Sequence, residues 1–298
     1  MKVYYVQPSD IGIAQFADTT LRPSGVEEVA HHTEADLCWC PTSLWGMRST
    51  PELAYRIANA FSAPERVVYS DCSDLDVTYD LRRSLMIRAN CRSWMRDTAP
   101  FTQPFAWPIE PEWGRIADEE AIFTTDVAFV GWSREPTQLA CNSIRSISGL
   151  SFQLVERNHF WGYWPAGDPQ ALQERAEMED SVRHARLNLS AESISGTIRY
   201  RTLEIMCAAR VPLVFASASC VWPFADDWRR EDCMFVYPIE DAPQAGEIVK
   251  RLLAEHDDSD LREMGRRGRE IWSKWMDRRK FGDLARILAE RHLDKLQR

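Results

Sequence analysis

At 298 residues the chain exceeds the usual size of a single domain, so we expect two domains. Hydrophobic residues make up 45% and charged residues 27% of the sequence, which is ordinary for a soluble globular enzyme. The net charge of −9 argues against a general nucleic-acid-binding surface, because such a surface needs a basic face.

The apolar runs and the cysteines indicate a cytoplasmic protein. Residues 2–6 read as a first strand and not as a signal peptide. No apolar run approaches the roughly 18 residues that a transmembrane helix needs. The cysteines are scattered, and the pair Cys38 and Cys40 lacks the second pair that a zinc site requires. We therefore expect free, buried thiols in a reducing compartment.

The first half of the sequence alternates predicted strands and helices. The predicted strands cover residues 2–6, 35–40 and 66–70, and the predicted helices cover residues 25–33, 50–61 and 81–96. Such an alternation predicts a parallel sheet. Residues 100–111 carry four prolines and are predicted to be a linker.

A second alternation fills the rest of the chain. The predicted strands cover residues 126–130, 151–155, 185–189, 211–217 and 233–237, and helices are predicted at 138–146, 169–183 and from about 199, with three more closing the chain. The expected fold is therefore α/β. We expect two Rossmann-like β/α domains, residues 1–112 and 113–298, that face each other across a ligand cleft.

One polar stretch carries the best candidate binding site. A loop with Ser195 and Gly196 leads into an apolar helix whose first turns carry Arg199, Arg201 and Glu204. A short apolar strand follows, so these side chains are expected at the carboxyl edge of a parallel sheet, where ligands usually bind. Guanidinium groups at a helix N-terminus attract phosphate. The alternative is a solvated Arg–Glu pair on a surface helix, worth about 0.2–0.5 kcal/mol.

A second candidate anion contact follows the first strand of the second domain. Gly131 would let the backbone approach a diphosphate closely, and Arg134 would supply positive charge. The alternative is a plain turn between a strand and a helix. The sequence alone leaves both open.

The residues from Gly196 to Pro212 resemble the C-terminal signature of exostosin-type glycosyltransferases. In that signature a glycine-containing loop precedes an arginine, an acidic residue and a turn into Pro-Val. Residues 222–228 look like the Leu-Pro-Phe and Asp-Trp segment of the same family, and residues 32–41 are similar to its N-terminal strand. The matches follow in order over most of the chain. Arg210 departs from the pattern, because the family has a small residue or cysteine there.

The resemblance implies the GT-B fold and the transfer of a sugar from a nucleoside diphosphate sugar to a hydroxyl acceptor, a glycan or another molecule. It implies that Arg201 faces the diphosphate and Glu204 the ribose. Retaining relatives carry an acidic residue where Gly196 stands, which favours inversion here. The alternatives are a non-catalytic nucleotide- or sugar-binding protein of this fold and a magnesium-dependent phosphatase.

An inverting transfer needs a general base near the acceptor hydroxyl. Asp71 and Asp74 follow the predicted strand at 66–70 and are the best-placed carboxylates of the first domain, although an acidic helix cap is the alternative. Asp74 and Asp76 also spell the D-x-D of metal-dependent sugar transferases. Because three-letter matches are common by chance, we expect no metal and no cofactor beyond the donor.

Overall fold

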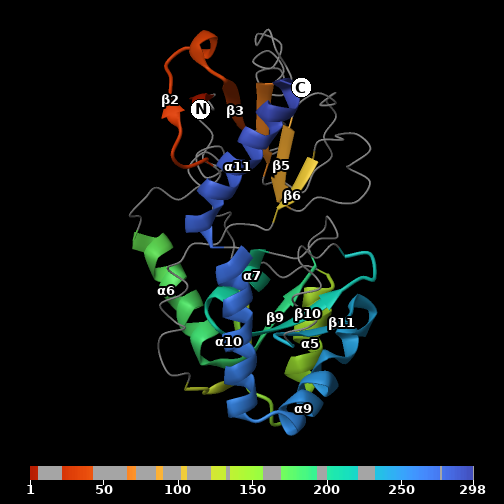
Figure 1. Cartoon of the computed structure of the whole chain (residues 1–298). Coiled ribbons are helices and arrows are strands. Elements are labelled where there is room, and N and C mark those ends of the chain that lie inside the picture. The colour runs from red at the N-terminus through yellow and green to blue at the C-terminus, as the bar shows by residue number, and fades with distance from the viewer. Residues whose placement is uncertain are drawn as a thin grey trace. The chain divides into compact units, whose positions relative to one another are not determined.

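The chain divides into two compact units, each built on a parallel β-sheet. The computed structural model describes residues 1–5, 22–42, 66–71, 85–89, 102–105, 122–131, 135–156, 169–192, 200–220, 232–275 and 277–297. The first unit comprises Met1–Pro108 together with Arg278–Arg298, and the second comprises Ile109–Asp277. The colours of Figure 1 follow the chain through both units.

The first unit holds a sheet of parallel strands in the order β2-β1-β3-β4-β5-β6. These strands are β1 (Lys2–Tyr5), β2 (Glu27–Glu28), β3 (Leu37–Thr42), β4 (Val67–Asp71), β5 (Leu85–Ala89) and β6 (Thr102–Phe105), with the 3-10 helix η1 (His32–Glu34) between β2 and β3. Because β1 lies between β2 and β3, the strand order reverses there. Such a reversal is the place where open α/β sheets bind ligands.

The C-terminal helix α11 (Arg278–Gln297) packs within the first unit. Its small residues Ala285 and Ala289 are fully buried in one apolar cluster with side chains of β1, β3 and β4. Its backbone also accepts a hydrogen bond at Gly282 O from Ser24 N, at 2.9 Å. The expected domain of residues 113–298 included this helix, whereas the structure joins it to the first sheet.

The second unit holds a sheet of parallel strands in the order β11-β10-β9-β7-β8. These strands are β7 (Thr125–Gly131), β8 (Phe152–Glu156), β9 (Ala185–Ala191), β10 (Val211–Ala216) and β11 (Phe235–Pro238). The first strand, β7, again lies between the second and the third, so the strand order reverses between β7 and β9. Within the described strands, both sheets therefore follow the same doubly wound pattern.

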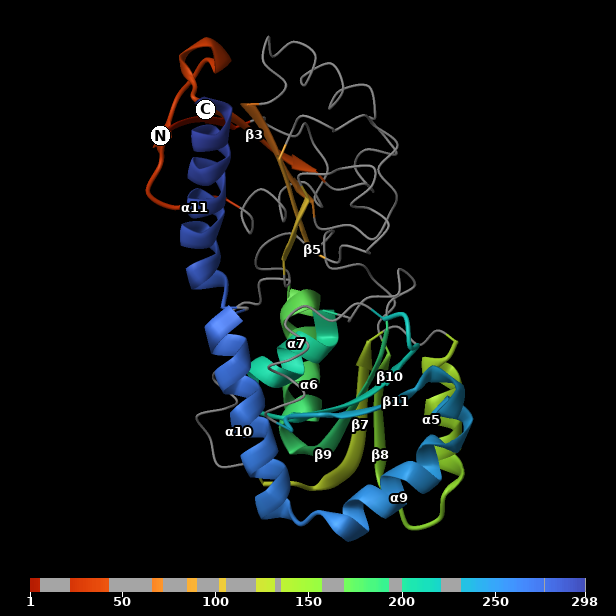
Figure 2. The same ribbon diagram turned by 45° about the vertical axis from the view of Figure 1, so that its right-hand side comes forward.

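Helices cover both faces of the second sheet (Figure 2). Helix α5 packs against α9 on one face, and α6, α7 and α10 cover the other. The elements are α5 (Thr137–Ser146), α6 (Pro169–His184), α7 (Tyr200–Cys207), the 3-10 helix η4 (Ile239–Gln244), α9 (Ala245–Glu255) and α10 (Asp258–Trp275).

Strand β9 shows why two layers of helices are needed. Its odd-numbered residues Leu187 and Leu189 are buried in the cluster that includes α5 and α9. Its even-numbered residues face α6 and α7: Asn188 Nδ2 donates to Val182 O at 3.4 Å, and the hydroxyls of Ser190 and Thr202 lie 2.8 Å apart. Side chains alternate between the two faces of a strand, so β9 is almost wholly buried only because helices cover both faces of the sheet.

Three sequence predictions for the first half were wrong. Residues 25–33, predicted as a helix, hold β2 and lead into η1, and residues 81–96, also predicted as a helix, contain β5. The segment 100–111, predicted as a linker, contains β6. These strands have two to five residues, which is too short for the spacing of apolar residues to distinguish a strand from a helix. The helix predicted at 50–61 lies outside the described residues.

Five cysteines whose side chains the structure describes are free thiols. Four of them are buried, and Cys220 is half-buried: Cys38, Cys141, Cys207, Cys220 and Cys233. Burial raises the pKa of the Cys38 thiol to about 12 and that of Cys141 to about 11. These two thiols are therefore protonated and unreactive at neutral pH. Among the described helices, none is long and apolar enough to cross a membrane.

Candidate functional site

The candidate site lies at the carboxyl edge of the second sheet, where the strand order reverses. Gly131 ends β7, and Glu192 follows the last residue of β9. Gly131 has a φ of +142°, a backbone conformation that favours glycine. A Cβ atom there would be 3.7 Å from Phe129 Cζ, which is an ordinary contact. Glycine is thus required at this position by conformation and not by lack of space.

Helix α7 brings Arg201 and Glu204 to the same edge. Arg201 Nη1 forms an ion pair with Glu204 Oε2, one helical turn further on. Arg201 is 9% exposed, and Glu204 is fully buried. The interpretation of these two residues as a solvated surface pair was therefore wrong. Both oxygens of Glu204 are shielded from solvent, so in this conformation the carboxylate faces the guanidinium and not water.

The position of Arg201 on its helix is electrostatically unusual. The N-terminal turn of a helix carries partial positive charge, so a cation there is disfavoured and an anion is favoured. Burial adds a desolvation cost, which the Glu204 carboxylate offsets within the pair. A guanidinium held at this place by a carboxylate is suited to receive a second anion, such as a phosphate group.

A contact that the sequence analysis missed joins the ends of β9 and β10. Glu192 Oε2 accepts hydrogen bonds from Ser217 N and Ser217 Oγ, both at 2.7 Å. The residues 217–220 form a turn in which Cys220 N donates to Ser217 O at 3.0 Å. Burial, the charge of Glu192 and a hydrogen bond to it raise the pKa of the Cys220 thiol to about 12. Glu192 and Ser217 each directly follow a strand of the structure, but the predicted strands ended at residues 189 and 217, so the sequence did not place the two residues side by side.

The structure locates some of the predicted site residues. Gly131, Arg201 and Glu204 belong to the second unit, at the carboxyl edge of its sheet. Asp71 is the last residue of β4 in the first unit, and the register sets it beside Thr42 of β3 and Arg88 of β5. The remaining predicted residues lie outside the described residues: Asp74, Arg134, Ser195, Gly196 and Arg199. Among the residues described, no group of three or more His, Cys, Asp or Glu side chains could hold a metal ion.

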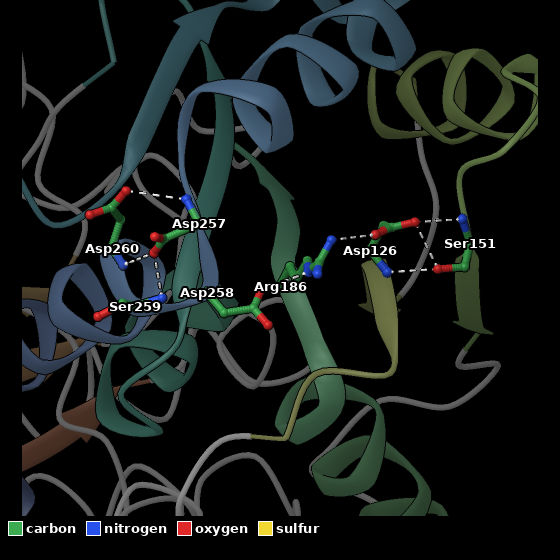
Figure 3. Close-up of polar contacts among 7 residues, drawn as sticks. All are labelled: Asp126, Ser151, Arg186, Asp257, Asp258, Ser259 and Asp260. Carbon is green, nitrogen blue, oxygen red and sulfur yellow. Dashed lines mark hydrogen bonds and ion pairs between the residues drawn. The ribbon is translucent and has the colours of Figure 1, made fainter.

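The opposite, amino edge of the second sheet carries a polar network of its own (Figure 3). Asp126 Oδ2 accepts hydrogen bonds from Ser151 N and Ser151 Oγ, both at 2.9 Å, which joins β7 to the start of β8. Arg186 at the start of β9 lies between two carboxylates, 3.3 Å from Asp126 Oδ1 and 2.9 Å from Asp258 Oδ1. The second contact ties the sheet to the N-terminus of α10. This network pairs Arg186 with both carboxylates and joins β7, β8, β9 and α10 at this edge.

Arg210, the departure from the exostosin pattern, also belongs to the amino edge. Its guanidinium is buried and donates to Arg183 O at 3.0 Å, Ala208 O at 3.1 Å and Ala209 O at 3.2 Å. These carbonyls end helices α6 and α7, so one side chain satisfies acceptors at the ends of two helices. Arg210 thus has a structural explanation away from the candidate site.

The fold is similar to that of several solved glycosyltransferases. HepE from Anabaena, in complex with UDP-glucose, matches with a TM-score of 0.57 at 10% identity, over 96% of this chain and 98% of HepE. A glycosyltransferase from Rickettsia africae matches with a TM-score of 0.62 at 6% identity, over 98% of each chain. At such identities the likeness shows a shared fold. No protein-family model and no curated protein matches the sequence.

Proposed function

We propose that this chain is a glycosyltransferase that moves a sugar from a nucleoside diphosphate sugar to a hydroxyl acceptor. The observation that carries the proposal is the buried Arg201, which is held by Glu204 in the first turn of α7, at the carboxyl edge of the sheet. A whole-chain likeness in fold to glycosyltransferases, one of them in complex with UDP-glucose, supports the choice of donor. UDP is the nucleotide to test first.

In this proposal the donor binds the second unit. Arg201 contacts the diphosphate, and the Gly131–Arg134 turn and the Ser195–Arg199 segment complete the diphosphate contacts. Glu204 orients Arg201 through their ion pair. A ribose hydroxyl reaches the Glu204 carboxylate only when the buried pair opens, because both carboxylate oxygens are shielded from solvent.

The first unit supplies the acceptor side. Asp71 or Asp74 acts as the general base that takes the proton of the acceptor hydroxyl, and the sugar is transferred with inversion and without a metal. The two units then face each other across a cleft in the GT-B arrangement, within an exostosin-type family. The free thiols suit a cytoplasmic enzyme, because disulfides are rare in that compartment.

Donor binding gives the sharpest test. We expect isothermal titration calorimetry to detect the binding of UDP and UDP-glucose by the unmodified protein. We expect R201M to weaken the binding of both at least about tenfold, because the variant loses one charge-assisted contact. R210M is the matched control, because Arg210 is a buried arginine at the other end of α7. Equal binding by R201M and the unmodified protein would remove Arg201 from the site.

Turnover separates an enzyme from a binding protein. We expect the unmodified protein to release UDP from UDP-glucose in the presence of EDTA, slowly onto water and faster once the acceptor is supplied. The double variant D71A/D74A is expected to keep UDP binding and lose turnover. If the unmodified protein binds the donor but never turns it over with any hydroxyl acceptor, it is a binding protein that has retained the fold.

A further inference from the structure

Two carboxylate–serine contacts of the same chemistry lie at opposite edges of the second sheet. In each, one carboxylate oxygen accepts from both the backbone N–H and the hydroxyl of a serine next to the neighbouring strand. Glu192 holds Ser217 in this way beyond the carboxyl ends of β9 and β10. Asp126 holds Ser151 near the amino ends of β7 and β8 (Figure 3). We call these contacts the carboxyl clamp and the amino clamp.

The carboxyl clamp extends the pairing of β9 and β10 beyond the sheet. The last residues in register are Ala191 and Phe215, and Glu192 N still donates to Phe215 O at 2.9 Å. Next to this bond, the Glu192 carboxylate accepts a hydrogen bond from Ser217 N in place of a backbone carbonyl. The side chain thus holds Glu192 and Ser217 together at the carboxyl ends of β9 and β10.

The segment that leaves β9 at this point is the one that leads to α7. Glu192 is followed by the connection 193–199, and α7 begins at Tyr200. The other side of the clamp, Ser217, begins the segment that follows β10. A binding site at the ends of such strands gains affinity when its groups are ordered before the ligand arrives, because less conformational entropy is then lost on binding.

We propose that Glu192 is a positioning residue of the donor site, which acts by binding Ser217 and thereby holding together the carboxyl ends of β9 and β10, beside helix α7. The inference rests on the proposed function, because the site it positions is the nucleotide site at α7. It assigns different roles to the two clamps. The amino clamp stabilises the sheet only, whereas the carboxyl clamp stabilises the sheet and also sets nucleotide affinity.

Calorimetric titration with UDP tests this difference. The proteins are the unmodified chain, E192A, E192Q and the matched control D126A, at a temperature at which circular dichroism shows all of them folded. We expect E192A to raise the Kd for UDP about tenfold, because this variant loses a charge-assisted contact that orders the site. E192Q keeps an acceptor oxygen for Ser217 N and is expected to recover most of that loss. D126A is expected to lower the melting temperature and leave the Kd unchanged.

A milder pair protects the test against unfolding. S217A and S151A each remove one serine hydroxyl and leave the carboxylate and the backbone N–H of the clamp in place. We expect only S217A to weaken UDP binding, by about threefold, since one hydrogen bond remains.

The outcomes distinguish the two proposals. If the unmodified protein binds neither UDP nor GDP nor dTDP, the proposed function is wrong and this inference is wrong with it. If the unmodified protein binds but E192A binds equally well, only this inference is wrong. It is also wrong if D126A weakens binding as much as E192A does, because Glu192 would then act through stability alone.

Discussion

The two ends of helix α7 each hold a buried arginine, and the two stand in opposite relation to the helix. Arg210 lies beyond the C-terminal end, where its guanidinium donates to three backbone carbonyls and the negative end of the helix dipole favours a cation. Arg201 lies in the first turn, where the dipole disfavours a cation, and it is paired with Glu204. Because the N-terminal end of a helix favours an anion and the C-terminal end does not, we expect a further anion to bind at Arg201 and not at Arg210.

The same contrast separates the two edges of the second sheet. At the amino edge, Asp126, Arg186 and Asp258 satisfy one another and join the strands to α10. At the carboxyl edge, the polar groups gather around the reversal of the strand order, where a ligand would approach the sheet. Chemically similar contacts thus serve stability at one edge and, we propose, binding as well at the other.

The largest expected effect comes from breaking the buried pair. E204Q leaves the Arg201 guanidinium buried without the charge of its partner, so we expect the free energy of unfolding to fall by about 3 kcal/mol in a urea titration. The double variant R201M/E204L replaces both charges by apolar groups and is expected to recover most of that loss. A change below about 0.5 kcal/mol for E204Q would mean that the pair behaves like a solvated surface pair.

The arginine at the other end of α7 tests whether the two ends differ in function. R210M removes three hydrogen bonds from a charged donor, and we expect the free energy of unfolding to fall by about 2 kcal/mol. Because Arg210 belongs to the amino edge, the Kd for UDP is expected to stay unchanged by calorimetry. If R210M weakened UDP binding as much as R201M, the comparison between the two ends would fail.

Two glycines allow the same comparison for the backbone. Gly131 ends β7 at the carboxyl edge with a φ of +142°, and Gly149 precedes β8 at the amino edge with a φ of +90°. We expect G131A and G149A each to lower the free energy of unfolding by about 1 kcal/mol, because a side chain strains either conformation. Only G131A is expected to weaken UDP binding in calorimetry. Equal UDP affinity of the two variants would exclude the carboxyl end of β7 from the site.

The sequence predicted each described strand of the second unit, but in the first unit it predicted β1, β3 and β4 and missed β2, β5 and β6, for a physical reason. Strands β7, β9 and β10 have six or seven residues and are buried on both faces, and each contains enough apolar residues to leave a clear signal. Strand β2 has two residues and β6 contains a proline, so their existence depends on neighbours that a local pattern does not contain.

A local sequence pattern also does not show which sheet a helix packs against. The periodicity of α11 predicted a helix with an apolar stripe, but not which sheet that stripe would cover. For the candidate site, the sequence placed Arg201 and Glu204 at a helix start, as found. It did not reveal that the two are buried against each other, or that Glu192 holds Ser217. The burial of the pair depends on how α7 packs against α10 and the sheet, and the Glu192–Ser217 contact depends on how β9 and β10 lie beside one another.

The smallest expected effect concerns the N-terminus of α10, which completes the amino edge. Asp257 Oδ1 accepts hydrogen bonds from Ser259 N at 2.7 Å and Asp260 N at 3.0 Å, and these bonds hold the pKa of Asp257 below its usual value of 3.8. A carboxylate with a lowered pKa stabilises the folded state above its unfolded pKa, and this contribution is lost as the pH falls through the folded pKa. In urea titrations, D257A is therefore expected to be less stable than the unmodified protein at pH 7, with a difference that shrinks as the pH falls below about 3.8. A difference that stays constant between pH 7 and pH 2.5 would show that Asp257 stabilises the amino edge by something other than its charge.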